Sequence, residues 1–149
     1  IFISENMKFA FAQVLIVQSE VHMELKEFKI AKENLDRASE ISIDFNNPQM
    51  NGRIYSAYAQ ICIEEKKVDE ALDYLDDALD IFMDVNNKLR SSHILVMMGS
   101  LYLKKNKIKK AEKSYDRAKK LLSRIDGVYS TISDDLTILK EGIEEKKLA

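Results

Sequence analysis

The sequence predicts an all-α fold in which antiparallel helix pairs stack into an α-solenoid. The first reason is an internal repeat with a period of forty residues, since Val68–Asn87 resembles both Phe28–Asn47 and Ile108–Gly127. The second is that the 149 residues include only four glycines and one proline, which leaves little of the chain for loops. A fixed period of this length is typical of repeat architectures, in which each helix pair buries its apolar faces against its neighbours.

Composition excludes several classes of function. The chain is 46% hydrophobic and 32% charged, and its net charge of −2 gives no indication of a nucleic-acid or membrane partner. No apolar run approaches the roughly 20 residues that a membrane helix needs. The single cysteine, Cys62, rules out an intramolecular disulfide and fits a reducing compartment. We therefore expect a cytoplasmic protein.

The pattern of apolar residues predicts seven helices, in three pairs followed by one helix. Their expected ranges are 7–25 and 29–45, 49–65 and 69–85, 88–105 and 109–125, and one helix within 128–149. The helix ends are marked by Asn46–Asn47–Pro48, by Asn86–Asn87 and by Gly127, because asparagine and glycine tolerate the left-handed conformation that ends a helix. Asn47 is expected to cap the helix that follows it, with Pro48 in the first turn.

These segments predict a single repeat array over residues 1–149. Its repeats are 7–47, 48–87 and 88–127, followed by a capping helix at 128–149. Residues 1–6 resemble 81–86, so we expect them to be the end of a preceding repeat. An apolar surface around Phe2, Phe9 and Phe11 would then lack its stacking partner. We expect another copy of the chain to cover it, which means self-association through the N-terminal repeat face.

Small residues recur where the helices of a pair would cross. They are Ser19, Ala59 and Gly99 at one position, then Ala31, Ala71 and Ala111, and then Ala38, Ala78 and Ala118. On these residues the sequence resembles the tetratricopeptide repeat family, although its period is forty rather than thirty-four. The two spaced alanines favour this family over armadillo and HEAT repeats of similar period. The resemblance implies a right-handed α-solenoid of about three full repeats plus a C-terminal capping helix.

In this family the first helix of each pair lines a concave groove that binds a partner. The resemblance places partner-binding residues at Gln13, Ile16, Glu20, Arg53, Ser56, Gln60, His93, Val96, Met97 and Ser100. We expect an apolar anchor to bind against Ile16, Val96 and Met97, and a carboxylate to bind Arg53, the one fixed positive charge in this set. The lysine and asparagine clamp of chaperone-binding members is absent at these positions, so a chaperone co-factor role is not expected.

No motif indicates an enzyme, a cofactor or a metal site. His22 is expected to be a packed core histidine, and Cys62 a buried apolar residue. The sequence therefore predicts a non-enzymatic scaffold that binds a protein or a peptide. The alternative is a sensory or peptide-binding domain of a bacterial transcriptional or signalling regulator, and a third interpretation is an array that only oligomerises.

Charged residues form matched rows in two successive repeats. The acidic row is Asp69, Asp73, Asp77, Asp80 and Asp84, and the basic row, forty residues on, is Lys109, Lys113, Arg117, Lys120 and Arg124. A basic row is one feature of nucleic-acid binding, but no aromatic residues are interleaved for base stacking. We expect the two rows to lie beside each other instead, and nucleic acid is not an expected partner.

Overall fold

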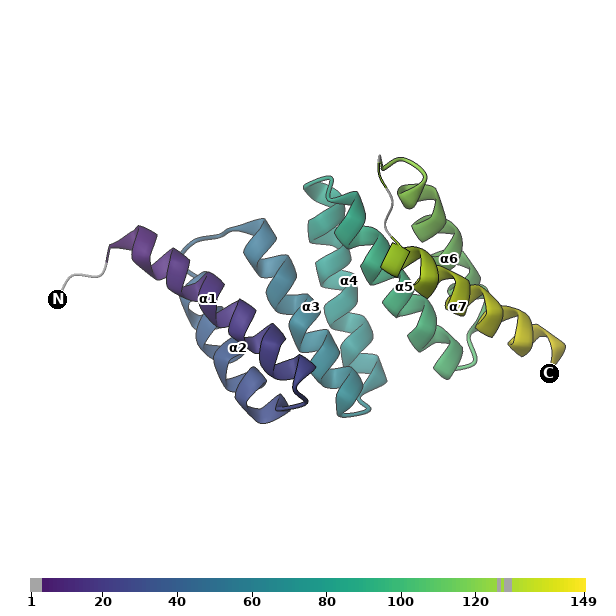
Figure 1. Cartoon of the computed structure of the whole chain (residues 1–149), viewed down its shortest axis with the longest axis horizontal. Coiled ribbons are helices and arrows are strands. Elements are labelled where there is room, and N and C mark those ends of the chain that lie inside the picture. Colours follow the sequence, from purple (N-terminus) through teal and green to yellow (C-terminus); the bar gives the residue numbers. More distant parts are fainter. Residues whose placement is uncertain (1–3, 126, 128–129) are drawn as a thin grey trace. The chain divides into compact units, whose positions relative to one another are not determined.

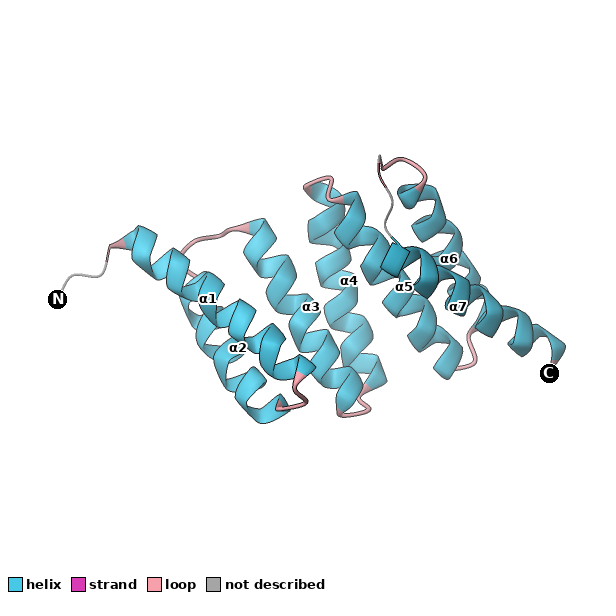
Figure 2. Ribbon diagram, viewed as in Figure 1, coloured by secondary structure: helices cyan, strands magenta, loops and turns pink. Residues whose placement is uncertain are grey.

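A computed structural model describes residues 4–125, 127 and 130–149, with the side chain of Ser130 excepted. Within them the chain forms seven α-helices and no strand, so the predicted all-α class is confirmed (Figures 1 and 2). The helices are α1 (Glu5–Glu24), α2 (Phe28–Ser42), α3 (Pro48–Glu64), α4 (Val68–Asp84), α5 (Lys88–Lys104), α6 (Ile108–Leu122) and α7 (Ser130–Leu148).

The ends of α1, α3, α4 and α5 share one hydrogen-bonding pattern. After each helix a residue adopts the left-handed conformation, with φ of 61° at Lys26, 61° at Lys66, 56° at Asn86 and 60° at Asn106. The next amide then donates to a carbonyl oxygen five residues back, as Lys67 does to Cys62 at 2.8 Å. This Schellman pattern satisfies the last carbonyl groups of the helix and lets the chain reverse within three residues.

The predicted cap of the second helix pair is confirmed, and the third pair has an equivalent one. The side chain of Asn47 accepts a hydrogen bond from the amide of Met50 at 2.9 Å, and Pro48 occupies the first turn of α3. Asn87 caps α5 in the same way, through the amide of Arg90. In α1 the equivalent position is Met7, which cannot cap, and the helix instead begins at Glu5 behind the cap Ser4.

Two helices end three residues earlier than expected. α2 was predicted to reach Phe45 but ends at Ser42, and α6 was predicted to reach Ile125 but ends at Leu122. After Ser42 the amides of Asp44 and Phe45 donate to carbonyl groups three residues back, so the last turn tightens and the α-helical ladder stops. The hydroxyl of Ser42 donates to the carbonyl oxygen of Ser39 in this turn.

The chain divides into two compact units, Ile1–Ile81 and Phe82–Ala149. The division lies inside α4 rather than between two of the predicted repeats. The expectation of one array over residues 1–149, with repeats at 7–47, 48–87 and 88–127, stays a prediction.

In the first unit, α3 packs against the pair formed by α1 and α2. The core combines residues of all three helices that are at most 4% exposed, namely Ala12, Leu15, Ile16, Leu35, Ala38, Met50, Ile54, Ala57 and Ile61. Ala31 and Ala38 of α2 are fully buried, as the close approach of two helix axes requires. The helix-crossing role predicted for these alanines agrees with their burial.

In the second unit, α7 packs against both α5 and α6. The contact between α5 and α7 is close because each of these two helices has a glycine there, Gly99 on α5 and Gly142 on α7. A Cβ atom at residue 99 would lie 2.6 Å from Cδ2 of Leu139, and one at residue 142 would lie 2.9 Å from Cδ1 of Leu103. Leu139 is 2% exposed whereas Lys140 points to solvent, as expected of a helix that caps an array.

Candidate partner-binding site

The predicted site residues of the first unit come from one face of α1 and one face of α3. Gln13 and Glu20 are two turns apart on α1, and Arg53, Ser56 and Gln60 have helical spacing on α3. Gln13 is exposed and the other four are half-buried. The two helices are in contact, so these polar side chains belong to adjoining surfaces of one unit.

Glu20 and Arg53 bind each other across the two helices. The Nη2 atom of Arg53 lies 2.9 Å from both carboxylate oxygens of Glu20. The Arg53 side chain is 23% exposed and that of Glu20 is 41% exposed, so solvent reaches the pair only in part. The positive charge that was predicted to bind a carboxylate of the partner is therefore already balanced by Glu20, another residue of the predicted set.

Two predicted contact residues belong to the core instead. Ile16 is 0% exposed and packs with Leu15, Leu35 and Ala38, and Val96 of α5 is 7% exposed. An apolar anchor cannot reach either side chain while the helices keep their packing. The expected anchor on Ile16 and Val96 is therefore corrected, and the described surface at these positions is more polar than predicted.

The predicted residues of the second unit lie on α5. His93 and Ser100 are exposed and Met97 is half-buried. Although part of the His93 side chain reaches solvent, protein packed around it disfavours the charged form and lowers its pKa, and the carboxylate of Asp135 on α7 opposes this shift. The Ser100 hydroxyl donates to the carbonyl oxygen of Val96 at 3.2 Å. Because these residues belong to a different unit from Arg53, a continuous groove along α1, α3 and α5 stays a prediction.

Two residues outside the predicted set were also given roles from the sequence. His22 is half-buried at the end of α1, where its Nδ1 lies 2.5 Å from Oε2 of Glu27. It was predicted to pack in the core, and this is corrected, because its side chain instead bonds to the turn that follows α1. Cys62 is buried, as predicted, and desolvation raises the pKa of its thiol. A raised thiol pKa disfavours the thiolate, which is the nucleophilic form of cysteine.

Sequence reasoning missed a group of stacked tyrosines between α3 and α4. The Tyr74 ring lies 5.3 Å from that of Tyr58 and 6.2 Å from that of Tyr55. The Tyr58 hydroxyl donates to the carboxylate of Asp36 on α2 at 2.6 Å, and burial together with this bond raises the pKa of Tyr58. The sequence does contain a signal for this group. Of the three equivalent positions 18, 58 and 98, only position 58 carries a tyrosine, and the other two carry Gln18 and Met98.

The predicted apolar surface near the N-terminus is present in a different form. Phe2 lies outside the described residues. Phe9 is half-buried and packs edge-on against Phe45 at 5.4 Å, so its expected exposure is corrected. Phe11 is 45% exposed, and further apolar residues along α1 are exposed with it. Self-association through this face stays a prediction.

In the part of the chain that the structure describes, no group of three or more histidine, cysteine, aspartate or glutamate side chains is arranged to hold a metal ion. None of the described helices is both long and apolar enough to cross a membrane.

Comparisons with known proteins agree with the helix-pair architecture. The family model for the tetratricopeptide repeat matches residues 50–124, which is just over half of the chain. No curated protein matches the sequence. The crystal structure of BtubC (BKLC) from P. vanneervenii is similar, with a TM-score of 0.70 and 16% sequence identity over 95% of this chain. This chain spans 64% of that protein, less than two thirds of its length, and at this identity the likeness concerns the fold alone. On the match to the family model, the chain belongs to the tetratricopeptide repeat family.

Proposed function

We propose that this chain is a scaffold that binds a protein or peptide segment on the polar surface of α1 and α3. Repeats of the family generally form scaffolds for protein–protein interaction. The observation that supports this location is the Glu20–Arg53 pair, which joins the two helices within the predicted set of residues. The pair holds two charged, partly exposed side chains in fixed positions, so that their arrangement does not have to form during binding.

The chemistry of this surface favours an extended peptide with polar groups. Gln13 and Gln60 each carry an amide that both donates and accepts hydrogen bonds, which suits the alternating groups of a peptide backbone. A carboxylate on the partner competes with Glu20 for Arg53, and a basic group on the partner pairs with Glu20. An acidic partner therefore needs to displace an internal carboxylate before it gains Arg53, which lowers its affinity relative to a neutral segment.

A signalling peptide sensed by a bacterial regulator is one partner of this class. That function differs from a constitutive scaffold in that binding alters an output. A peptide selected for binding to this chain would show which class of peptide sequence the surface of α1 and α3 binds. That result is informative for both the scaffold and the peptide sensor.

The test is a selection from a random displayed peptide library on the wild-type chain. The selected peptide is then labelled, and its dissociation constant is measured by fluorescence anisotropy for two double variants. We expect Gln13→Ala with Gln60→Ala to weaken binding at least several-fold, with helical circular dichroism unchanged. The matched control, Asp73→Ala with Asp77→Ala, changes two exposed polar residues of α4 and should leave binding unchanged. The opposite result for the two variants would place the site away from α1 and α3.

A further inference from the structure

A small pocket lies between the end of α2, the loop that follows it and the N-terminal half of α3. It has a volume of about 180 Å³, and its lining residues are Ser39, Ser42, Ile43, Asn46, Asn51, Ile54 and Tyr55. Its floor is buried, since Ser42 is 6% exposed and Ile54 is 3% exposed. Ile43 and Asn46 are exposed and form its mouth. The pocket is therefore closed at the bottom and reached from solvent at one side.

The repeat register explains why this space is not filled. Forty residues on, the equivalents of Ser39 and Ser42 are Leu79 and Phe82, which are 5% and 0% exposed. A leucine side chain and a phenyl ring are thus buried in the next repeat at the two positions where this repeat has serine. Because protein interiors are otherwise closely packed, two much smaller side chains at these positions leave a space.

The polar groups around the pocket are available to a ligand. Within the described residues, the side chains of Asn46, Asn51 and Tyr55 form no hydrogen bond with another residue. The Ser42 hydroxyl donates to the carbonyl oxygen of Ser39 at 2.8 Å, so its oxygen is left as an acceptor. A hydroxyl group on a ligand can therefore both donate and accept hydrogen bonds here.

The lining also restricts the charge and the size of the ligand. None of the seven lining residues is charged, so an ionised group would lose its hydration here without gaining a counter-ion. Sites for drug-sized molecules have volumes of about 300 Å³ or more, which limits the ligand of this smaller pocket to a single ring.

We propose that the pocket binds a small uncharged aromatic ring that carries a hydroxyl group, as in a phenol. The ring corresponds to that of Phe82, which is buried at the equivalent position of the next repeat, and it packs against Ile54 and Tyr55. The hydroxyl group bonds to the amide and hydroxyl groups of the lining. A free phenol and the tyrosine side chain of a partner protein share this chemistry, and the experiment separates them. The pocket shares no residue with the polar surface of α1 and α3, so this proposal is independent of the one above.

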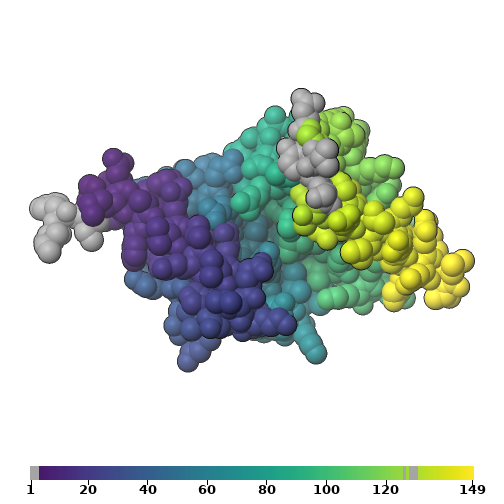
Figure 3. Space-filling model, viewed as in Figure 1, coloured from purple at the N-terminus to yellow at the C-terminus, as the bar shows by residue number. Residues whose placement is uncertain are grey.

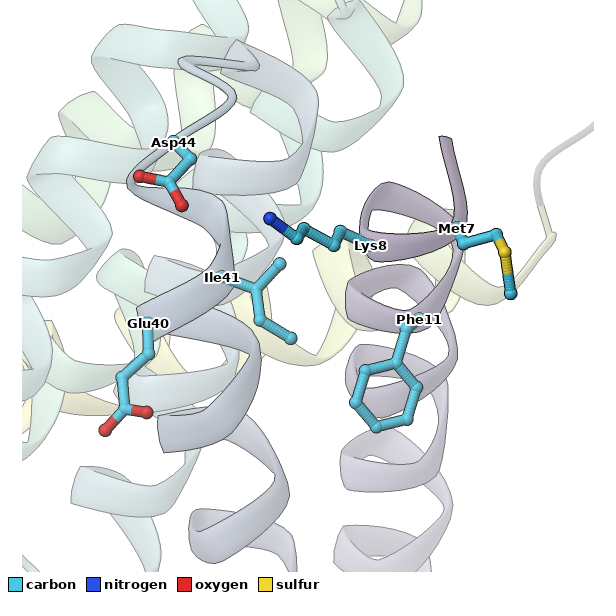
Figure 4. Close-up of a pocket in the computed structure, with 6 residues that line it drawn as sticks. All are labelled: Met7, Lys8, Phe11, Glu40, Ile41 and Asp44. Carbon is cyan, nitrogen blue, oxygen red and sulfur yellow. The ribbon is translucent and has the colours of Figure 1, made fainter. Parts of the chain in front are cut away.

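A larger hollow on the first unit has to be distinguished from this pocket. α1 forms the purple surface of that unit in Figure 3, and the hollow lies between α1 and α2 with a volume of about 590 Å³. Its lining is partly charged, with Lys8, Glu40 and Asp44 beside Phe11 and Ile41 (Figure 4). A small aromatic molecule can also enter this hollow. A variant at Phe11, which is 45% exposed, therefore serves as a control for the site of binding.

The experiment titrates the intact chain with p-cresol, which has the ring and the hydroxyl group of a tyrosine side chain, and follows the protein by NMR. We expect saturable binding with a dissociation constant of about 1 mM. Ser42→Phe should weaken it at least tenfold, because the new phenyl ring would occupy the pocket. The matched control Ser123→Phe makes the same change at the exposed end of α6, where the hydroxyl also bonds to a carbonyl oxygen three residues back, and should leave binding unchanged. Phe11→Ala should leave it unchanged as well.

Further ligands test the chemical class. Toluene is p-cresol without the hydroxyl group and should bind at least several-fold more weakly. Asn51→Ala should weaken the binding of p-cresol several-fold with helical circular dichroism unchanged, and it provides the test if Ser42→Phe does not fold. N-acetyl-tyrosinamide presents the same ring as a side chain. Equal binding of this compound and p-cresol would assign the pocket to a tyrosine of a partner, and binding of p-cresol alone would assign it to a free phenol.

Three results would overturn the proposal. An absence of saturable binding up to about 10 mM p-cresol would mean that the pocket holds only water. Binding that a folded Ser42→Phe or Asn51→Ala variant retains in full, or that Phe11→Ala removes, would place the ligand elsewhere. Toluene that binds as tightly as p-cresol would show that the hydroxyl group is not recognised.

Discussion

α1 and α3 occupy equivalent positions in two successive repeats, yet one exposes the face that the other buries. Val14 and Val21 are about half exposed, whereas Ile54 and Ile61, forty residues on, are 3% and 2% exposed. All four are β-branched and apolar, so the residue type does not explain the difference. The neighbour does, because α2 covers α3 and no described helix covers the outer face of α1. In a repeat protein, burial is therefore a property of the stack rather than of the single helix.

The two faces also differ in their polar residue. Tyr58 bonds to Asp36 of the covering helix, and its equivalent on α1 is Gln18, which is exposed. The half-buried hydroxyl of Tyr58 has a fixed partner, while an exposed amide exchanges hydrogen bonds with water. The polar side chain on α3 should therefore contribute to the free energy of unfolding, whereas its equivalent on α1 should not.

The largest expected difference comes from truncating equivalent apolar side chains. Ile54→Ala should lower the free energy of unfolding by about 2–4 kcal/mol, because it removes buried apolar surface and leaves a cavity. Val14→Ala should change the same quantity by less than about 0.5 kcal/mol, since the side chain is half exposed in the folded state. Urea denaturation followed by circular dichroism measures both. Equal losses would mean that α1 is covered in the isolated chain, and the comparison would fail.

A smaller effect is expected at the polar position. Tyr58→Phe should cost about 1 kcal/mol, as a partly exposed hydrogen bond to a carboxylate is lost, whereas Gln18→Ala should cost almost nothing. The pKa of Tyr58 is raised in the folded state. Its contribution is then fully present below the ordinary tyrosine pKa of about 10, and it is lost as the pH rises above that value. Denaturation at several pH values should show a weaker alkaline decline in Tyr58→Phe than in the wild type.

The smallest effect should be the same in both repeats. Lys26 and Lys66 both adopt the left-handed conformation, with φ of 61°. Asparagine tolerates this conformation better than lysine, so Lys26→Asn and Lys66→Asn should each raise the free energy of unfolding by about 0.5 kcal/mol. Thermal denaturation of the two single variants and of the pair measures this gain. Unequal gains would show that the two repeats differ in their turns as well as in their covering.

The helices could be predicted from the sequence because each depends on local signals that recur every forty residues. The small residues at the crossings and the asparagines at the ends placed most boundaries within two residues. The ends of α2 and α6 were missed because the amides after each helix donate to carbonyl groups three residues back, and the spacing of apolar residues does not distinguish such a turn from a continuing α-helix.

The candidate site was predicted less well, because it depends on how neighbouring helices rotate about their axes. The register assigned Glu20 and Arg53 to one surface, but it did not show that they bind each other. It also assigned Ile16 to that surface although this residue faces the core. A rotation of one helix by a fraction of a turn exchanges core and surface positions, and the one-dimensional pattern does not determine that rotation.

The glycine and leucine contacts between α5 and α7 have a consequence for how such sequences tolerate insertions. Leu139 occupies the space above Gly99, and Leu103 occupies the space beside Gly142, so each helix receives a side chain from the other. Two reciprocal contacts of this kind fix the translation of α7 along α5 without help from the connecting segment. A change in the length of the chain between α6 and α7 should then leave the position of the last helix unchanged.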